Sequence, residues 1–111
     1  MVKSELVVEG PPKYVEMTDL VAGARGSISG DAVVISDVVL VMSNYESQVE
    51  AGAKATELKA LVSSLVADLT KDELRTFEGK ARLKTHIQRE INHVLSKGQV
   101  NDVLFSKFLV R

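Results

Sequence analysis

The spacing of apolar residues predicts two strands, then helices, then a final strand. After Gly10-Pro11-Pro12, residues 13–21 contain five large apolar side chains suited to a first strand. The glycine-rich stretch from Gly23 to Asp31 predicts a loop. A second strand is predicted from Ala32 to about Met42, because six of its residues are β-branched Val or Ile. A third strand is predicted from Gln99 or Val100 to Val110.

A long first helix is predicted from Tyr45 or Glu46 to Leu69, with Asn44 as its N-cap. A continuous helix of this length would span roughly 36 Å, which is as long as a small domain is wide. We therefore expect its first turns, which carry small residues between Val49 and Ala55, to project beyond the core. The second half has the 3.6-residue period of one buried stripe, made by Leu58, Leu61, Val62, Leu65, Val66 and Leu69.

Two threonines predict the starts of two further helices. Thr70 precedes Glu73 at the spacing of a capping box, so residues 71–75 are predicted to form a short helix. Thr76 then begins a longer helix, and Lys97-Gly98 is expected to end it with a left-handed glycine cap. The stripe expected on this helix is Phe77, Ala81, Leu83, Ile87, Ile91, Val94 and Leu95.

These elements predict an α+β domain, in which a small antiparallel or mixed sheet of about three strands packs against two main amphipathic helices. The composition fits one globular domain: 111 residues, 45% apolar and 26% charged, with a net charge of -1. This charge balance disfavours nucleic acid as a partner. No apolar run reaches the roughly 20 residues that span a bilayer. The sequence has no cysteine, which excludes disulfides and thiolate chemistry.

Few residues suggest catalysis or metal binding. His86 and His93 lie seven residues apart, beyond the spacing at which two helical imidazoles share a metal. No glycine-rich segment leads into a helix as a phosphate loop does. Asp37 interrupts the apolar second strand, and we expect a bulge or bend there that turns its charge to solvent. The alternatives are a satisfied, partly buried carboxylate or a catalytic one, for which no partner is visible. We therefore predict no enzyme activity, no cofactor and no metal.

Three segments in the second half of the chain resemble a known family. They are Leu74-Arg75-Thr76-Phe77-Glu78-Gly79-Lys80, the helical text from Ile87 to Leu95 that contains Ile91-Asn92-His93-Val94-Leu95, and the ending from Gly98 to Arg111. They are similar to the "LRT-x-EG", "IN-x-VL" and "V-x-DV-x-F-x-x-F" patterns of the FliL family of flagellar basal-body proteins. Tyr14-Val15-Glu16 resembles the family's first strand. The resemblance covers residues 13–111.

The resemblance implies a periplasmic domain with a stomatin-like (SPFH-like) fold at the bacterial inner membrane. It implies a non-enzymatic role in which copies assemble as a homo-oligomer, as a ring, and associate with flagellar stator subunits to support torque, swimming and swarming. Residues 1–12 would be a flexible head that follows a removed membrane anchor, and residues 13–111 would be the domain. Membrane contact would then come only through an N-terminal helix absent from this chain. Phe77 departs from the family, which usually has proline there; we expect its ring to pack beside Leu74 and Ala81.

Two pairs of residues are candidate assembly or partner contacts. Val49 and Ala53 belong to the projecting part of the first helix, where small side chains permit a close approach. Phe105 and Phe108 belong to the final strand, where simple alternation puts them on opposite faces of the sheet. The alternative function is a small soluble α+β scaffold or ligand-binding domain unrelated to flagella.

Overall fold

The computed structural model describes residues 13–24 and 33–111. The predicted head (residues 1–12), most of the predicted loop from Gly23 to Asp31, and Ala32 lie outside the described residues. The described elements confirm the predicted α+β order. They are β1 (Lys13–Gly23), β2 (Val33–Met42), α1 (Tyr45–Ala53), α2 (Ala55–Ala67), α3 (Lys71–Arg75), α4 (Phe77–Val94) and β3 (Val100–Val110).

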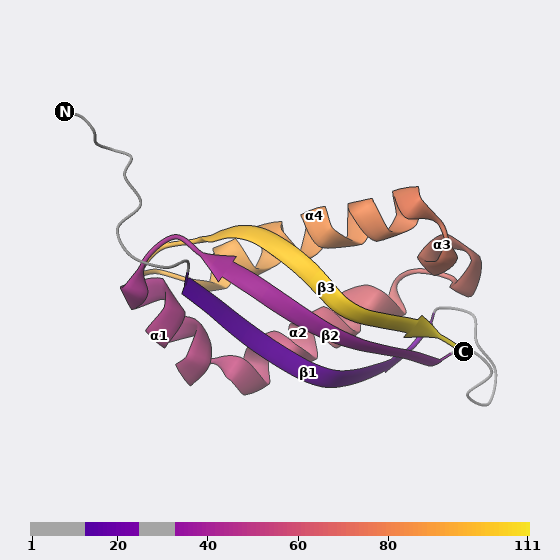
Figure 1. Cartoon of the computed structure of the whole chain (residues 1–111), viewed down its shortest axis with the longest axis horizontal. Helices are drawn as coiled ribbons and strands as arrows, with labels where there is room; N and C mark the ends of the chain where they lie inside the picture. The colour runs from indigo at the N-terminus through magenta and orange to yellow at the C-terminus, as the bar shows by residue number, and fades with distance from the viewer. Residues whose placement is uncertain (1–12, 25–32) are drawn as a thin grey trace.

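The strands form one antiparallel sheet in the order β1-β2-β3. The helices that connect β2 to β3 pack on one face of this sheet, which Figure 1 shows with α2 and α4 behind the strands. Side chains on that face, here called the inner face, meet the helices in a single core. The largest fully buried side chains are Met17, Val34, Val38, Leu40, Leu58, Val62, Leu74, Leu83, Ile87, Ile91, Val100 and Val103.

The predicted long helix is two helices, with a break at Lys54. The backbone of Lys54 leaves the helical region (φ −101°, ψ 18°), although its N–H still donates to the Glu50 carbonyl at 3.0 Å. The change of direction lets α1 bury Ser47 and Ala51 against the sheet, while α2 buries Leu58, Val62 and Val66. The expectation that the first turns project beyond the core is therefore wrong. Leu61, Leu65 and Leu69 of the predicted stripe are partly buried beside the core.

The helix starts are as predicted. Asn44 and Thr70 form capping boxes with Ser47 and Glu73, and the Thr76 side chain accepts the Gly79 N–H at 2.9 Å. The expected left-handed cap at Gly98 is wrong, because α4 ends at Val94 and its C-cap residue, Leu95, has an extended conformation. Gly98 instead lets the turn before β3 pass close to Asn44, because a Cβ at residue 98 would lie 2.7 Å from Asn44 Oδ1.

The apolar stripe of α4 also differs from the expectation at its start. Phe77 is 85% exposed and Ala81 is exposed, so the predicted packing of the Phe77 ring is wrong. Gly79 takes the buried position instead, in register with Leu83, Ile87 and Ile91. The reason is the tight corner between α3 and α4, where a Cβ on residue 79 would overlap the Glu73 carbonyl.

Asp37 lies where the register shifts on both sides of β2. Thr18 and Asp19 of β1 lie opposite it, since Met17 pairs with Val38 and Leu20 with Ser36. On the other side, Ser106 is an extra residue in β3. The expected bulge is therefore present, but it belongs to the neighbouring strands. β2 itself keeps its alternation of buried and half-buried residues, and Asp37 stays on the face of Ile35 and Val39.

None of the described helices is both long enough and apolar enough to cross a membrane.

The α3–α4 corner gives the first prediction. We expect Gly79→Ala to lower the free energy of unfolding by about 1–3 kcal/mol, because the new methyl group overpacks against the Glu73 carbonyl. Gly52→Ala is the matched control: nothing lies within 4 Å of its Cβ, so it should stabilise α1 by about 0.4–1 kcal/mol. Urea unfolding of both variants tests this. A Gly79→Ala protein as stable as wild type would contradict the described corner.

Candidate functional site

The described surface offers three features: the sheet face opposite the helices, the exposed side of α1, and a charged cluster at the centre of the sheet. The sheet face and the charged cluster join residues that are far apart in the sequence, whereas the side of α1 belongs to one helix. Their geometry decides whether they suit catalysis, ligand binding or contact with another protein.

The charged cluster joins the three strands. Asp37 Oδ1 accepts the Asp19 backbone N–H at 2.7 Å, and Lys107 Nζ lies 3.0 Å from Asp19 Oδ1 and 3.8 Å from Asp37 Oδ1. Asp19 adopts a positive φ of 55°, a region in which Asp is more common than most residues, and this directs its N–H to Asp37. The hydrogen bond that Lys107 Nζ donates to the Asp19 carboxylate raises the pKa of Lys107. Asp37 is thus a paired carboxylate that holds the two bulges together.

The bulge at Ser106 changes the direction of the side chains that follow it. Phe105 pairs with Val38 and Phe108 with Ser36, so both rings lie on the inner face. Their ring centroids are 4.9 Å apart, and Lys80 Nζ lies 5.2 Å from the Phe108 centroid. The expectation of opposite faces is therefore wrong. Both rings are half-buried against the core, and their role as partner contacts stays a prediction.

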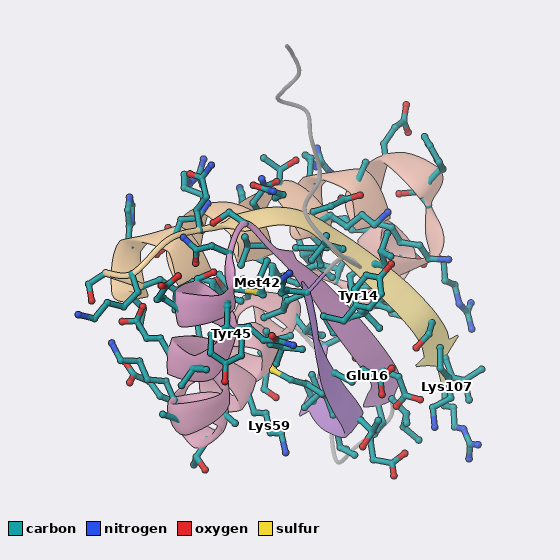
Figure 2. The ribbon with its side chains drawn as sticks, turned by 60° about the vertical axis from the view of Figure 1, so that its left-hand side comes forward. Tyr14, Glu16, Met42, Tyr45, Lys59 and Lys107 are labelled. Atoms are coloured by element: carbon teal, nitrogen blue, oxygen red, sulfur yellow. The ribbon has the colours of Figure 1, made fainter. Side chains whose placement is uncertain are left out.

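The other face of the sheet is not covered by any of the described helices. We call it the open face; Figure 2 shows Tyr14, Glu16 and Lys107 on this side, away from Lys59 of α2. Tyr14, Val21, Leu104 and Leu109 are 40–60% exposed there. Strict alternation along β3 missed this surface, because it groups Leu104 with Phe108.

The exposed side of α1 carries the other predicted pair. Val49 is 52% exposed, and Ala53 is exposed one turn further along. Figure 1 places α1 at the opposite end of the molecule from the end of β3, so the four candidate residues form two separate sets. A surface hollow of about 430 Å³ lies beside Val49; its lining is Tyr45, Glu46, Val49, Glu50 and Lys97.

Glu50 connects α1 to the turn between α4 and β3. Its carboxylate accepts the backbone N–H groups of Ser96 at 2.9 Å and Lys97 at 2.8 Å, and the Ser96 hydroxyl at 2.9 Å. Lys54 Nζ lies 3.2 Å from the same group. Desolvation alone would raise the pKa of Glu50, but these hydrogen bonds outweigh it and lower the pKa to about 2. Sequence reasoning missed this role because the partners are 46 and 47 residues away.

Two amides of α4 fix the start of β3. The Asn92 side chain accepts the Val100 N–H at 2.7 Å, and Gln88 Nε2 donates to the Val100 carbonyl at 3.1 Å. These bonds satisfy backbone groups beside the register shift between Val41 and Met42. Asn92, a residue of the recognised motif, therefore has a structural role that its sequence position did not indicate.

The remaining polar side chains include the two histidines of α4 and the carboxylates at the α3–α4 corner. Within residues 13–24 and 33–111, no group of three His, Cys, Asp or Glu side chains is placed to hold a metal ion. His86 and His93 are both exposed, and His93 Nδ1 lies 4.0 Å from Glu90 Oε1. At the α3–α4 corner, Glu73 is already used by the capping box with Thr70.

Fold and surface together define a class: a small α+β domain with helices on one face of a three-stranded sheet, whose described surfaces suit binding. The sequence profile described as "Flagellar basal body-associated protein FliL" matches residues 14–110. The chain therefore belongs to the FliL family, a family of flagellar accessory proteins. It is also 28% identical over 101 residues to "Flagellar protein FliL" of Aquifex aeolicus (strain VF5). That alignment covers 91% of this chain and 58% of the relative's length.

The Glu50 contact gives the second prediction. Glu50 has an ordinary pKa of 4.5 and a folded-state pKa of about 2, so the unfolded chain binds more protons between these values. The stabilisation is complete above pH 4.5 and is lost as the pH falls towards 2. We expect Glu50→Gln to lower the melting temperature at pH 7 and to flatten its decline below pH 4.5.

Thermal melts followed by circular dichroism from pH 7 to pH 2 measure both effects. Glu57→Gln, which removes an exposed carboxylate on α2, is the control and should keep the wild-type pH profile. If Glu50→Gln also shows the wild-type profile, Glu50 does not hold the α4–β3 turn.

Proposed function

We propose that this domain supports the flagellar motor by assembling with copies of itself and associating with stator subunits. The proposal puts it at the periplasmic face of the bacterial inner membrane, in the flagellar basal body. The observation that carries it is the family match, which spans nearly the whole described fold from β1 to β3. The family match also removes the main support for the alternative of an unrelated scaffold whose likeness to FliL is fortuitous.

The surface supports a binding role for this domain. Val49 and Ala53 lie on one exposed side of α1 beside a hollow with apolar side chains, and the open face carries further exposed apolar residues. Exposed apolar groups gathered in this way are typical of protein contact surfaces. We propose Val49 and Ala53 as partner contacts, with Phe105 and Phe108 as a second pair.

Glu50 gives the α1 surface a fixed position. Because its carboxylate binds the turn before β3, α1 is held at both the sheet and the α4–β3 turn. A surface held in this way loses little conformational entropy when a partner binds. This rigidity suits a contact that must resist mechanical load.

Motility gives the third prediction. We expect deletion of the full-length gene to reduce swimming and swarming, most strongly in viscous or semi-solid medium, and the intact gene to restore both. A gene that lacks residues 13–111 should not restore them. Halo diameters and swimming speeds at several viscosities measure the effect.

A matched pair of variants tests the α1 surface in the same strains. Val49→Glu puts a charge on the proposed contact and should reduce the rescue, whereas Ser64→Glu puts the same charge on an exposed position of α2 and should not. Immunoblots check that both proteins accumulate. Unchanged motility in the deletion strain at every load would argue against the motor role; an effect of deletion without an effect of Val49→Glu would remove only the α1 contact.

A further inference from the structure

The open face is more apolar than one side of a solvated antiparallel sheet usually is. Such sheets normally alternate apolar residues towards the core with polar residues towards water. Here β2 is apolar on both faces except at Ser36 and Asp37. The outward apolar side chains of the three strands include Val21, Ile35, Val39, Val41, Leu104 and Leu109. Apolar surface gathered in this way marks a site that another surface covers.

The register arranges this face in rows that run across the strands. The central row is Asp19, Asp37 and Lys107. On one side of it lies the row Val21, Ile35 and Leu109, and on the other side the row Glu16, Val39 and Leu104. An end row then follows, with Tyr14, Val41 and Asp102.

We propose that the open face pairs with the open face of a second copy of this chain. The second copy is related by a two-fold axis that lies between the sheets and runs parallel to β2. This axis places β1 over β3 of the second copy and each β2 residue over itself. Two sheets then stack with their strands nearly aligned, as in β-sandwiches.

The charges select this axis. Lys107 comes over Asp19 of the second copy, and Asp19 comes over its Lys107, so opposite charges meet twice. The Tyr14 hydroxyl meets Asp102 of the second copy, and Val21 meets its Leu109. A two-fold axis across the strands would instead place Lys107 over Lys107 and Asp19 over Asp19, which repel. The acidic Glu16, Asp19, Asp37 and Asp102 outnumber Lys107 and Arg111, which disfavours an anionic lipid surface as the occupant. The same acidic excess weakens the pair, because Asp37 comes over Asp37 of the second copy about either axis.

The size of the face sets the strength of the pair. Strands of about ten residues at about 3.3 Å each, spaced about 4.8 Å apart, give a face of roughly 500 Å² per copy. The pair would bury roughly 1,000 Å² in total, which is at the lower limit of specific interfaces. The pair is therefore weak and forms at high local concentration. It goes beyond the proposed motor function: a two-fold pair closes at two copies, so it is a different contact from the one that builds a ring.

Single cysteines test the arrangement, because the natural chain has none. Ile35→Cys and Val39→Cys place thiols on β2, where each faces itself across the proposed axis. Facing sheets lie about 10 Å apart, so a short bis-maleimide joins two such thiols. Phe77→Cys is the control, since that position is 85% exposed at the α3–α4 corner, outside the open face. Circular dichroism confirms that each variant is folded.

We expect Ile35→Cys and Val39→Cys each to give at least about tenfold more cross-linked dimer than Phe77→Cys over a range of protein concentrations. An axis across the strands would instead join Ile35→Cys to Val39→Cys only when the two proteins are mixed, and this result would overturn the proposed arrangement. Sedimentation equilibrium of the cysteine-free chain is the second measurement. A monomer at every concentration, with no cross-linking above the control, would overturn the proposed pairing. None of these outcomes depends on motility, so the pairing fails or stands separately from the motor role.

Discussion

The two bulges beside Asp37, one in β1 and one in β3, determine which side chains of these strands face the helices and which lie on the open face. Strand pairing on either side of Asp37 includes one extra residue in β1 and one in β3. The Asp37 carboxylate accepts the Asp19 N–H and lies 3.8 Å from the Lys107 ammonium. Beyond the bulge in β3, every side chain lies on the face opposite to that given by simple alternation. Phe108 therefore joins Phe105 against the helices, and Leu109 joins Leu104 on the open face. The inward position of Phe108 and the outward position of Leu109 therefore have the same local cause.

Local signals explain why the sequence predicts most of the fold. The caps at Asn44, Thr70 and Thr76 depend on residues three positions away, and the strands depend on runs of apolar side chains. The break at Lys54 and the bulge at Ser106 involve contacts between distant segments, and the exposure of Phe77 follows from the tight corner between α3 and α4. Of the candidate site, the exposure of Val49 and Ala53 is consistent with a surface on α1. The faces of Phe105 and Phe108 were mispredicted, because one extra residue reverses the alternation.

Hydrogen bonds at the ends of the sheet hold α1 and α4 to the single face that the helices cover. α1 is held by Gln48, which donates to the Tyr14 carbonyl at 3.0 Å, and by Glu50, which accepts from the turn before β3. At the start of β3, Asn92 and Gln88 take the place of a neighbouring strand by bonding to the Val100 backbone. These polar contacts are directional, so they fix the helices where apolar packing alone would permit sliding. The open face can then remain free of helices without loss of order in the sheet.

The residues that carry the family resemblance serve mainly to build this frame. Thr76 caps α4, Gly79 permits the tight α3–α4 corner, Asn92 bonds to β3, and Gly98 lets the final turn pass close to Asn44. Each of these roles is internal, so the motif identifies the scaffold without locating its partner surface. Partner contacts must come from exposed positions, which the frame holds in place but which the motif does not specify. In this chain the partner contacts are proposed on the exposed side of α1 and on the open face of the sheet, where apolar side chains reach solvent.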